Sequence, residues 1–456
     1  MDFTQIRNKL IAAAQADLPE HLKRLDWSRE QLNAFQQNRL RQLLTWTKSK
    51  TSWYRQHLNH IDPATFTLNQ LSSLPTLTKS QVMQSWDELI AVPGLTREMA
   101  ENHLEQLRKG EIDNPYFNDQ YLFIATGGSS GTRGLFIWDL DFLKETACIN
   151  YRFLIHDERK ANYHESKKLA TIEAPTFLHG SQHLFTINVT DDIVVKALNV
   201  IDSLEKNIQV LQDFKPTYLV GFASYIASIA NAQLQGKLSI QPRWVSTNSE
   251  LLDDEMRSII YQAWGVKPCN SWGSVEIGSV AMENRLHEGM IIGEDGVILE
   301  LVNDNLAPVT SVTSATKILA TCLFNYSMPL IRYVIEDVLD ISHYAQDFPA
   351  YRMIKSVLGR TTDWFQYANC RIPPIAFRDI LSLSKEVREY QIIQTHDGAV
   401  LKLICIGKPN FIEIEKKTIE NLQQAGVKNP KVIIEIVTSF PKNPETGKVK
   451  RFVPLK

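Results

Sequence analysis

The chain has few of the cysteine and histidine patterns that are typical of zinc-binding or secreted proteins. Its 456 residues include five cysteines with no C-x-x-C pair among them (Cys148, Cys269, Cys322, Cys370 and Cys405). We therefore expect neither a disulfide framework nor a zinc knuckle, and we expect the protein to occur in a reducing compartment. His179 and His183 have H-x-x-x-H spacing, but no third ligand lies near them in the sequence. We accordingly expect a cytoplasmic protein.

Long hydrophobic runs and an excess of charge are also absent. No apolar run is long enough to span a bilayer, and residues 1–18 have the pattern of an amphipathic helix instead of a signal peptide. The formal net charge is −2 at pH 7. This charge gives no general attraction to nucleic acid or to an anionic membrane, so neither is expected as a partner.

The chain is too long for one ordinary hydrophobic core. Strand-like and helix-like segments alternate between residues 142 and 264, which indicates an α/β region. Short strands separated by turns follow from Gly289, and this pattern suggests a β-rich subdomain. The turn at 359–363 precedes an α+β unit of about a hundred residues, a common domain size. We expect an α/β protein with a large N-terminal region of several subdomains (1–360) and a small C-terminal domain (361–456).

One stretch, residues 121–139, stands out. Two β-branched and aromatic runs flank a glycine- and hydroxyl-rich segment that reads TGGSSGTRG from Thr126 to Gly134. Such a loop can wrap a phosphate with backbone N–H groups. Two alternatives stay open at this point. Gly127-x-Ser129-x-Gly131 fits the nucleophile elbow of a serine hydrolase, which needs a helix after it, and a hairpin loop without a ligand also fits. The Walker lysine is missing.

Three later segments carry chemistry-bearing residues. Glu276 follows Trp272-Gly273-Ser274-Val275 and has the oxygen ligands that Mg²⁺ prefers. Asp337 lies where it can accept hydrogen bonds from a sugar diol. Lys448 follows a glycine in a proline-rich segment and can carry a mobile ammonium group to a phosphate. Each segment is also compatible with a solvated turn, an ion pair or a basic tail.

These segments, in this order, resemble the adenylate-forming superfamily of acyl-CoA synthetases and ligases, and within it the phenylacetate-CoA ligase branch. The likeness covers nearly the whole chain. It includes the glycine loop, Asn248-Ser249-Glu250 in place of a G-A-E-like turn, the segment 272–276, Arg332-Tyr333 with Asp337, the hinge-like segment 359–363 and the terminal T-G-K-x-x-R. Leu74-Pro75-x-Leu77-Thr78-Lys79 and Lys215-Pro216-Thr217 also look like this branch.

The resemblance implies a role for each matching residue. Lys448 and Glu276 would be catalytic, with Glu276 as the Mg²⁺ ligand, and Asp363 would be the hinge of a rotating C-terminal domain. Phe222 and Tyr225 would lie near the acid. ATP binding is assigned to Thr126, Ser129, Ser130, Gly131, Thr132, Arg133, Ser249, Glu250, Asn270, Trp272, Gly273, Asp337 and Arg360.

The implied activity is ATP- and Mg²⁺-dependent activation of a carboxylic acid, possibly an aromatic one, as an acyl-adenylate. Pyrophosphate leaves, and the acyl group then passes to a thiol, with CoA as the expected co-substrate. The implied protein is a monomer or a homodimer.

Several departures keep other outcomes open. Thr132-Arg133 stands in place of Lys-Pro, Val275 in place of threonine, Glu336 in place of glycine, Thr362 in place of a hinge carboxylate and Asn369 in place of glycine. A carrier-protein thiol, an amine or a hydroxyl is therefore an alternative acceptor. A degenerate nucleotide-binding protein without turnover is the alternative from another class.

Overall fold

The computed structural model describes residues 1–126, 134–161, 167–173, 183, 187, 193–200, 202–250, 252–310, 315–345, 347–360, 363–368, 370–372, 377, 380–381, 386–405, 407–441 and 449–455. For residues 342, 343, 359, 360, 371 and 388 it describes the backbone alone. The glycine loop between 127 and 133 and the segment 442–448, which contains Lys448, lie outside the described residues.

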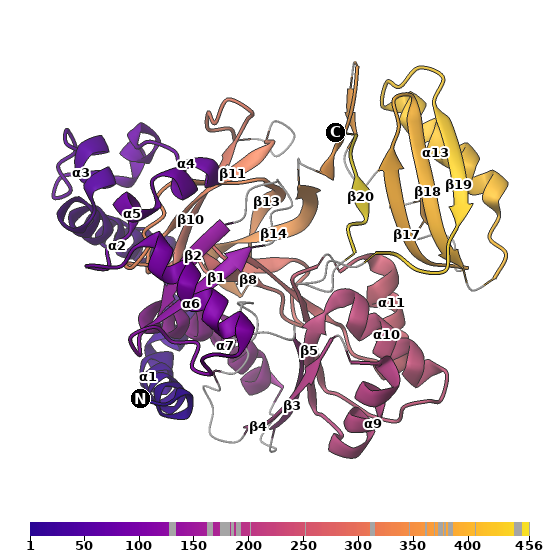
Figure 1. Cartoon of the computed structure of the whole chain (residues 1–456), viewed down its shortest axis with the longest axis horizontal. Helices are drawn as coiled ribbons and strands as arrows, with labels where there is room; N and C mark the ends of the chain where they lie inside the picture. Colours follow the sequence, from indigo (N-terminus) through magenta and orange to yellow (C-terminus); the bar gives the residue numbers. More distant parts are fainter. Residues whose placement is uncertain are drawn as a thin grey trace.

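The chain begins with helices, at the left of Figure 1. The amphipathic helix expected for residues 1–18 is present and continues to Lys23. A short 3₁₀ segment separates it from a second helix, which Ser28 caps by accepting a hydrogen bond from the Gln31 amide at 3.3 Å. The elements are α1 (Phe3–Lys23), η1 (Arg24–Asp26), α2 (Arg29–Lys50), α3 (Ser52–His57), η2 (Leu68–Ser73), α4 (Lys79–Gln84), α5 (Trp86–Leu89) and α6 (Arg97–Lys109).

A two-stranded antiparallel hairpin follows these helices. It consists of β1 (Tyr121–Thr126) and β2 (Gly134–Asp139), with Thr126 opposite Gly134. The two runs predicted as strands therefore form this hairpin. A strand, β2, follows the glycine loop directly, so the nucleophile-elbow geometry with a helix at that position is ruled out.

The central sheet has nine strands in the order β13-β14-β9-β8-β7-β6-β5-β3-β4. Strands β3 to β7 pair with one another in parallel, and the β7–β8 pairing is antiparallel. The bounds are β3 (Lys167–Glu173), β4 (Ile193–Asn199), β5 (Tyr218–Phe222), β6 (Trp244–Asn248), β7 (Cys269–Ser274), β8 (Gly278–Met282), β9 (Met290–Ile292), β13 (Asp337–Ala345) and β14 (Phe348–Arg360).

Helices cover both faces of the parallel part. On one face, α9 (Leu204–Phe214), α10 (Ala223–Leu234) and α11 (Asp254–Trp264) bury an apolar cluster that includes Ile172 and Val245. On the other face, Leu169, Tyr218, Trp244 and Cys269 pack with Leu154 of α7 (Leu140–Lys160). The predicted α/β region is confirmed, and Figure 1 shows α9–α11 together beside this sheet.

The prediction of a separate β-rich subdomain from Gly289 is only partly right. Strands β10 (Val297–Val302), β11 (Lys317–Cys322) and β12 (Tyr333–Ile335) form a three-stranded sheet of their own. In contrast, β9, β13 and β14 extend the central sheet. Strand pairing between segments far apart in the sequence decides this division, and periodicity alone does not reveal such pairing.

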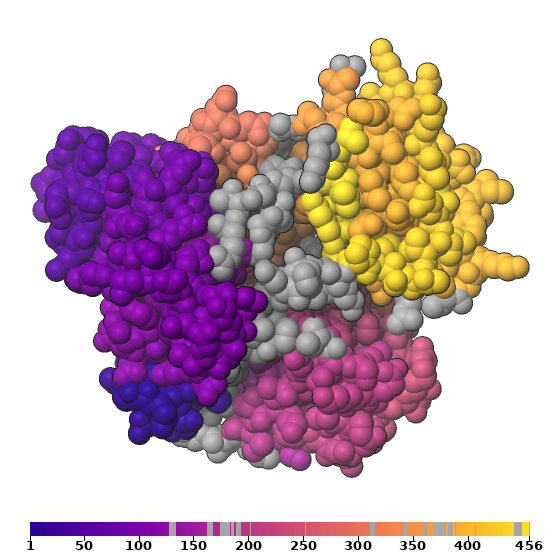
Figure 2. Space-filling view, in the orientation of Figure 1, coloured from indigo at the N-terminus to yellow at the C-terminus, as the bar shows by residue number. Residues whose placement is uncertain are grey.

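The C-terminal part has its own core. Its apolar cluster is built from residues 365 onward, including Phe365, Ile392, Leu401 and Leu422. Figures 1 and 2 show it as a separate lobe near α11. Its elements are β15 (Phe365–Tyr367), β16 (Cys370–Ile372), β17 (Val387–Gln394), β18 (Gly398–Cys405), α13 (Phe411–Gln424), β19 (Lys431–Ile436) and β20 (Phe452–Val453).

The strands of this lobe form a four-stranded sheet in the order β19-β18-β17-β20 and a small hairpin of β15 and β16. None of the helices described in either part of the chain is long and apolar enough to cross a membrane.

Candidate functional site

The candidate site lies where several parallel strands end. Strands β5, β6 and β7 finish at Phe222, Asn248 and Ser274, at one edge of the central sheet. In open α/β sheets, ligands bind in the crevice outside these carboxyl ends. The β1–β2 hairpin reaches the same place, because the Trp138 indole N–H donates to the Val275 carbonyl at 2.7 Å. The glycine-loop hairpin and the segment 272–276 are therefore neighbours in space.

The mouth of the glycine loop contains a lysine that sequence reasoning did not assign to the site. Lys79 Nζ donates to Thr126 Oγ1 at 2.9 Å, and the Gly134 amide donates to the same oxygen at 3.1 Å. A Cβ at position 134 would lie 2.7 Å from Thr126 Oγ1 and 2.8 Å from the Lys79 side chain, so only glycine fits there. Of the loop residues predicted to bind ATP, the structure describes Thr126, while Ser129, Ser130, Gly131, Thr132 and Arg133 lie outside the described residues.

The start of α4 holds Lys79 in place. Thr78 accepts a hydrogen bond from the Gln81 amide, and the Gln81 side chain accepts one from the Thr78 amide, so the helix begins with a capping box. The segment before it pairs with the Arg332-Tyr333 segment through Leu77 N to Arg332 O at 3.2 Å. The Leu-Pro-x-Leu-Thr-Lys pattern noted in the sequence is thus the local signal that could have led to Lys79.

Arg332 has a structural role in this arrangement. Its guanidinium is bonded to Glu300 at 3.0 Å and to the Leu74 carbonyl at 2.6 Å, and its backbone has a left-handed φ of 51°. The residue is only 3% exposed, so its charge is neutralised inside the protein. Arg332 therefore fixes the segment that leads to Lys79 and presents the next residue, Tyr333, to the site.

Tyr333 contacts the predicted magnesium ligand. Its hydroxyl donates to Glu276 Oε1 at 3.1 Å. Glu276 lies in the turn between β7 and β8, and Gly278 ends this turn with a φ of 78°. The other carboxylate oxygen has no hydrogen bond to any part of the chain that the structure describes. A carboxylate oriented by one hydroxyl, with its second oxygen available, is a suitable ligand for a divalent cation.

Asp337 is held from the opposite side of the same turn. Its Oδ2 accepts a hydrogen bond from the Trp272 indole at 2.9 Å, and both side chains are buried. Asp337 begins β13, directly opposite Arg360 at the end of β14. The backbone register therefore brings together the two residues that the resemblance assigns to the ribose. The side chain of Arg360 lies outside what the structure describes.

Three other predicted ATP-binding residues make contacts within the protein. Glu250 Oε2 accepts from the Ser224 amide at 3.0 Å and from its hydroxyl at 2.7 Å, so this carboxylate caps α10. Asn270 Oδ1 accepts from the Thr247 hydroxyl at 3.1 Å. Ser249 turns the chain with a left-handed φ of 61°. These contacts shape the turn after β6, and the ATP-binding role of the three residues stays a prediction.

Gly273 is required by close packing. A Cβ at this position would lie 2.2 Å from the Gly278 carbonyl oxygen. The glycine therefore allows the two sides of the β7–β8 hairpin to approach each other, and it places Trp272 and Glu276 on either side of the turn.

The two residues assigned to the acid lie on different faces of the sheet. Phe222 is buried at the end of β5. The Tyr225 ring packs in the α9–α11 cluster, and its hydroxyl accepts from Asn207 of α9 at 2.7 Å. Burial raises the pKa of Tyr225, and the hydrogen bond from Asn207 opposes this effect. The structure therefore does not bring Tyr225 together with Phe222.

Comparisons with known proteins found relatives of similar sequence and solved structures of similar fold. No family model matches the chain. It is 23% identical over 413 residues to phenylacetate-coenzyme A ligase of Thermus thermophilus, which covers 86% of this chain and 85% of the relative. The Pseudomonas putida phenylacetate-coenzyme A ligase is 25% identical over 201 residues, 45% of its length. A crystal structure of 2-hydroxyisobutyryl-CoA ligase in the postadenylation state has a TM-score of 0.71 at 15% identity, covering 92% of this chain and 89% of that one.

The chain has the fold of the adenylate-forming ligases. The resemblance to this superfamily and to its phenylacetate-CoA ligase-like branch is confirmed. The same 2-hydroxyisobutyryl-CoA ligase in its thioesterification state has a TM-score of 0.60, covering 94% of this chain and 90% of that one. The division at residue 360, the hinge at Asp363 and the individual site roles remain predictions.

Contact between the two parts of this ligase fold involves charge. Burial and the neighbouring Asp253 raise the pKa of Glu255 on α11 to about 7, and the positive charge of Arg451 lowers it in part. Arg451 belongs to the C-terminal lobe, where it also lies over the Tyr390 ring at 5.1 Å. Arg451, which precedes β20, thus lies near α11.

Proposed function

We propose that this chain activates a small carboxylic acid with ATP and transfers the resulting acyl group to the thiol of CoA. The observation that carries the proposal is the joint placement of Glu276 and Asp337 near one turn, beside the β1–β2 hairpin. The similarity to phenylacetate-coenzyme A ligases over most of the chain supports the same activity.

The first step joins the acid to AMP. A carboxylate oxygen attacks the α-phosphorus of ATP, and the bond from that phosphorus to pyrophosphate breaks. Asp337, with one oxygen fixed by Trp272, would accept hydrogen bonds from the ribose hydroxyls. Lys79 and the amides of the glycine loop would neutralise phosphate charge, and Lys448 would add a further positive charge as the transition state forms.

Magnesium fits the donors present at the site. Glu276 would hold the ion, and Tyr333 would orient this carboxylate. When bound, the ion would neutralise phosphate charge. No cluster of three or more potential metal-binding His, Cys, Asp or Glu side chains occurs among the described residues. A single protein carboxylate fits an ion that takes most of its remaining ligands from water and substrate phosphates.

The second step transfers the acyl group. The CoA thiolate attacks the acyl carbon, the bond to AMP breaks, and a thioester and AMP are formed. In this account the C-terminal domain turns about Asp363 between the two steps, so that Lys448 leaves the site and a different face approaches it.

A coupled assay tests this function. We would incubate the protein with ATP, Mg²⁺, CoA and a panel of aryl and alkyl acids, then measure acyl-CoA and AMP by mass spectrometry. Acid-dependent thioester in equal amount to AMP supports the proposal. If AMP forms without thioester, and an amide forms when an amine is supplied, the acceptor would be an amine instead of CoA. Binding of ATP without AMP formation by any acid would support the degenerate nucleotide-binding protein.

A further inference from the structure

Three side chains form a row on one face of the sheet, next to the candidate site. Glu173 ends β3, Phe222 ends β5 and Asn248 ends β6. Phe222 pairs directly with Asn248, and the pairing of Thr171 with Val220 places Glu173 level with Phe222. Alternate residues of a strand face the same side. All three therefore lie on the face where Leu169, Tyr218 and Trp244 pack toward α7.

Two members of this row are buried polar groups with unused hydrogen-bonding atoms. Glu173 is 4% exposed and Asn248 is 7% exposed. Glu173 Oε1 and Asn248 Nδ2 have no hydrogen-bond partner among the described residues. A buried polar atom without a partner is costly, so such atoms point to a bound molecule that satisfies them. One atom is an acceptor and the other is a donor.

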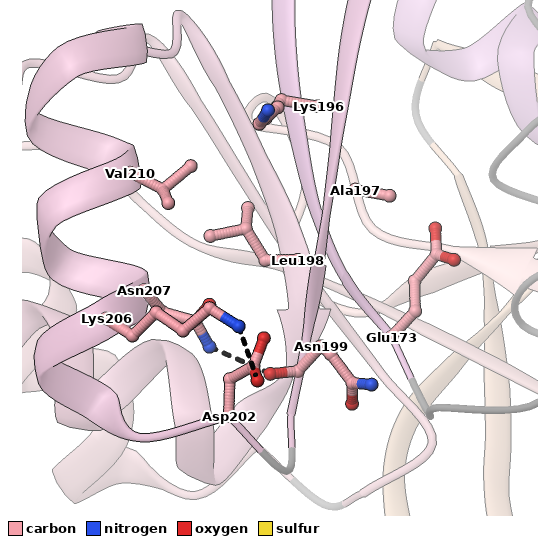
Figure 3. Close-up of a pocket in the computed structure, with 9 residues that line it drawn as sticks. All are labelled: Glu173, Lys196, Ala197, Leu198, Asn199, Asp202, Lys206, Asn207 and Val210. Atoms are coloured by element: carbon pink, nitrogen blue, oxygen red, sulfur yellow. Dashed lines mark hydrogen bonds and ion pairs between the residues drawn. The ribbon is translucent and has the colours of Figure 1, made fainter.

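The surroundings of Glu173 leave its carboxyl group available. A cavity of about 330 Å³ lies beside it on the side of β4 and α9, lined also by Lys196, Asn199, Asp202, Lys206 and Asn207, and neither Phe222 nor Asn248 lines it. The polar groups on the α9 side are already engaged, since Lys206 pairs with Asp202 at 2.9 Å and Asn207 donates to the Asn199 carbonyl at 2.8 Å. Figure 3 shows the carboxyl group of Glu173 directed away from Lys206.

The charge state of Glu173 agrees with this picture. Burial raises its pKa to about 7, while the Thr171 side chain and the positive charge of Arg7 act in the opposite direction. At neutral pH the carboxyl group therefore has both forms available. Oε1 of Glu173 accepts a hydrogen bond when the carboxyl group is ionised, and also when the proton resides on the other oxygen.

The spacing of the row matches a small substituted acid. One strand separates β3 from β6, so the two polar side chains start roughly 10 Å apart, with the Phe222 ring between them. An aromatic or short aliphatic body would pack on Phe222, and polar groups at its two ends would reach Asn248 and Glu173. An acid that is apolar at its far end would leave the buried carboxyl group unsatisfied.

We propose that Glu173 determines substrate specificity by accepting a hydrogen bond from a hydroxyl or amino group at the end of the acid remote from its carboxylate. Asn248, at the other end of the row, would donate to the acid through its amide. This inference rests on the proposed function and adds to it the class of acid: one that carries a distal hydrogen-bond donor.

Matched acids provide the test. Phenylacetate, 4-hydroxyphenylacetate and 4-aminophenylacetate would be compared by acid-dependent pyrophosphate release, using wild type, Glu173→Gln and Glu173→Leu. Glu205→Gln, at an exposed position at the start of α9, is the matched control. Thermal unfolding of each variant, with circular dichroism, confirms that it is folded before its kinetics are measured.

The diagnostic quantity is the ratio of kcat/KM between a donor-bearing acid and phenylacetate. We expect wild type to favour at least one donor-bearing acid by about 10- to 100-fold, the size of a hydrogen bond to a charged group. Glu173→Leu should abolish the preference, Glu173→Gln should keep part of it because its amide oxygen still accepts, and Glu205→Gln should keep all of it. A merely structural defect would lower kcat/KM for all acids equally and leave the ratio unchanged.

The outcomes separate the two proposals. Turnover of all three acids with no preference, or a preference that survives in Glu173→Leu, would overturn the role of Glu173 while leaving adenylation intact. No pyrophosphate release with these acids or with a broad aryl and alkyl panel would overturn the proposed function and this inference with it. A preference for 4-hydroxyphenylacetate over 4-aminophenylacetate, or the reverse, identifies which hydrogen-bond donor Glu173 accepts.

Discussion

Tyr333→Phe is the substitution whose effect the structure defines most closely. It removes one hydroxyl, which donates to Glu276 Oε1 at 3.1 Å, and leaves the aromatic ring in place. Tyr333 is only 2% exposed, so water does not readily replace the lost donor. The substitution therefore acts directly on the orientation and solvation of the Glu276 carboxylate.

The magnitude follows from what Glu276 is proposed to do. Loss of a group that orients a metal-binding side chain typically costs about 10- to 100-fold in metal affinity or activity. A hydrogen bond to a charged group contributes about 1.5–3 kcal/mol to stability, and the partial exposure of Glu276 favours the lower end of that range. We expect the Mg²⁺ concentration for half-maximal activity to rise about tenfold, with a smaller fall in kcat at saturating Mg²⁺.

The assay is pyrophosphate release at fixed ATP and acid across a Mg²⁺ titration. Tyr326→Phe provides the control, because the Tyr326 ring packs edge-on against Trp46 at 5.8 Å between centroids, away from Glu276. The reasoning fails if Tyr333→Phe loses stability as expected but keeps the wild-type Mg²⁺ dependence. In that case Glu276 would not be the metal ligand.

Three further predictions follow from other contacts. Lys79→Met should lower kcat/KM for ATP by about 10- to 100-fold through the loss of a phosphate-neutralising charge. Lys50→Met is the control and should have little effect in the same steady-state assay, because Lys50 lies over the Trp46 ring at 5.3 Å. Trp272→Phe should raise KM for ATP and lower the free energy of unfolding by about 1–3 kcal/mol, measured by urea denaturation, because Asp337 loses its buried donor; an unchanged KM would remove Asp337 from the nucleotide site. The pKa of Glu173 is raised from 4.5 to about 7. The stability that this group contributes, at most about 3 kcal/mol, is therefore fully present below pH 4.5 and is lost as the pH rises through about 7. Urea denaturation of Glu173→Gln should accordingly show a flatter pH profile over this window, and an unaltered profile would contradict the raised pKa.

Local sequence patterns predicted much of the secondary structure. The runs around the glycine loop form β1 and β2, and the alternation predicted between residues 142 and 264 is present as the strands and helices of the parallel part of the sheet. Gly265 ends α11 with a φ of 70°, as its position after the last apolar residue indicated. These features depend on side-chain periodicity and on backbone preferences that neighbouring residues decide.

Contacts between distant segments could not be read in this way. The pairing of Lys79 with Thr126, and of Tyr333 with Glu276, joins residues 47 and 57 positions apart. Glu250 was assigned to adenine from its place in the sequence, but its carboxylate caps α10, because the turn after β6 brings it to Ser224. The row of Glu173, Phe222 and Asn248 depends on the strand order of the sheet, which periodicity does not determine.

The most direct test of the central claim is the exchange of labelled pyrophosphate into ATP, measured with and without acid in wild type and Lys448→Ala. Formation of an acyl-adenylate is reversible, so the account predicts label in ATP only when an accepted acid is present, with the rate greatly reduced in the variant. No exchange with any acid, although ATP binds, would contradict the account. So would exchange that is independent of acid.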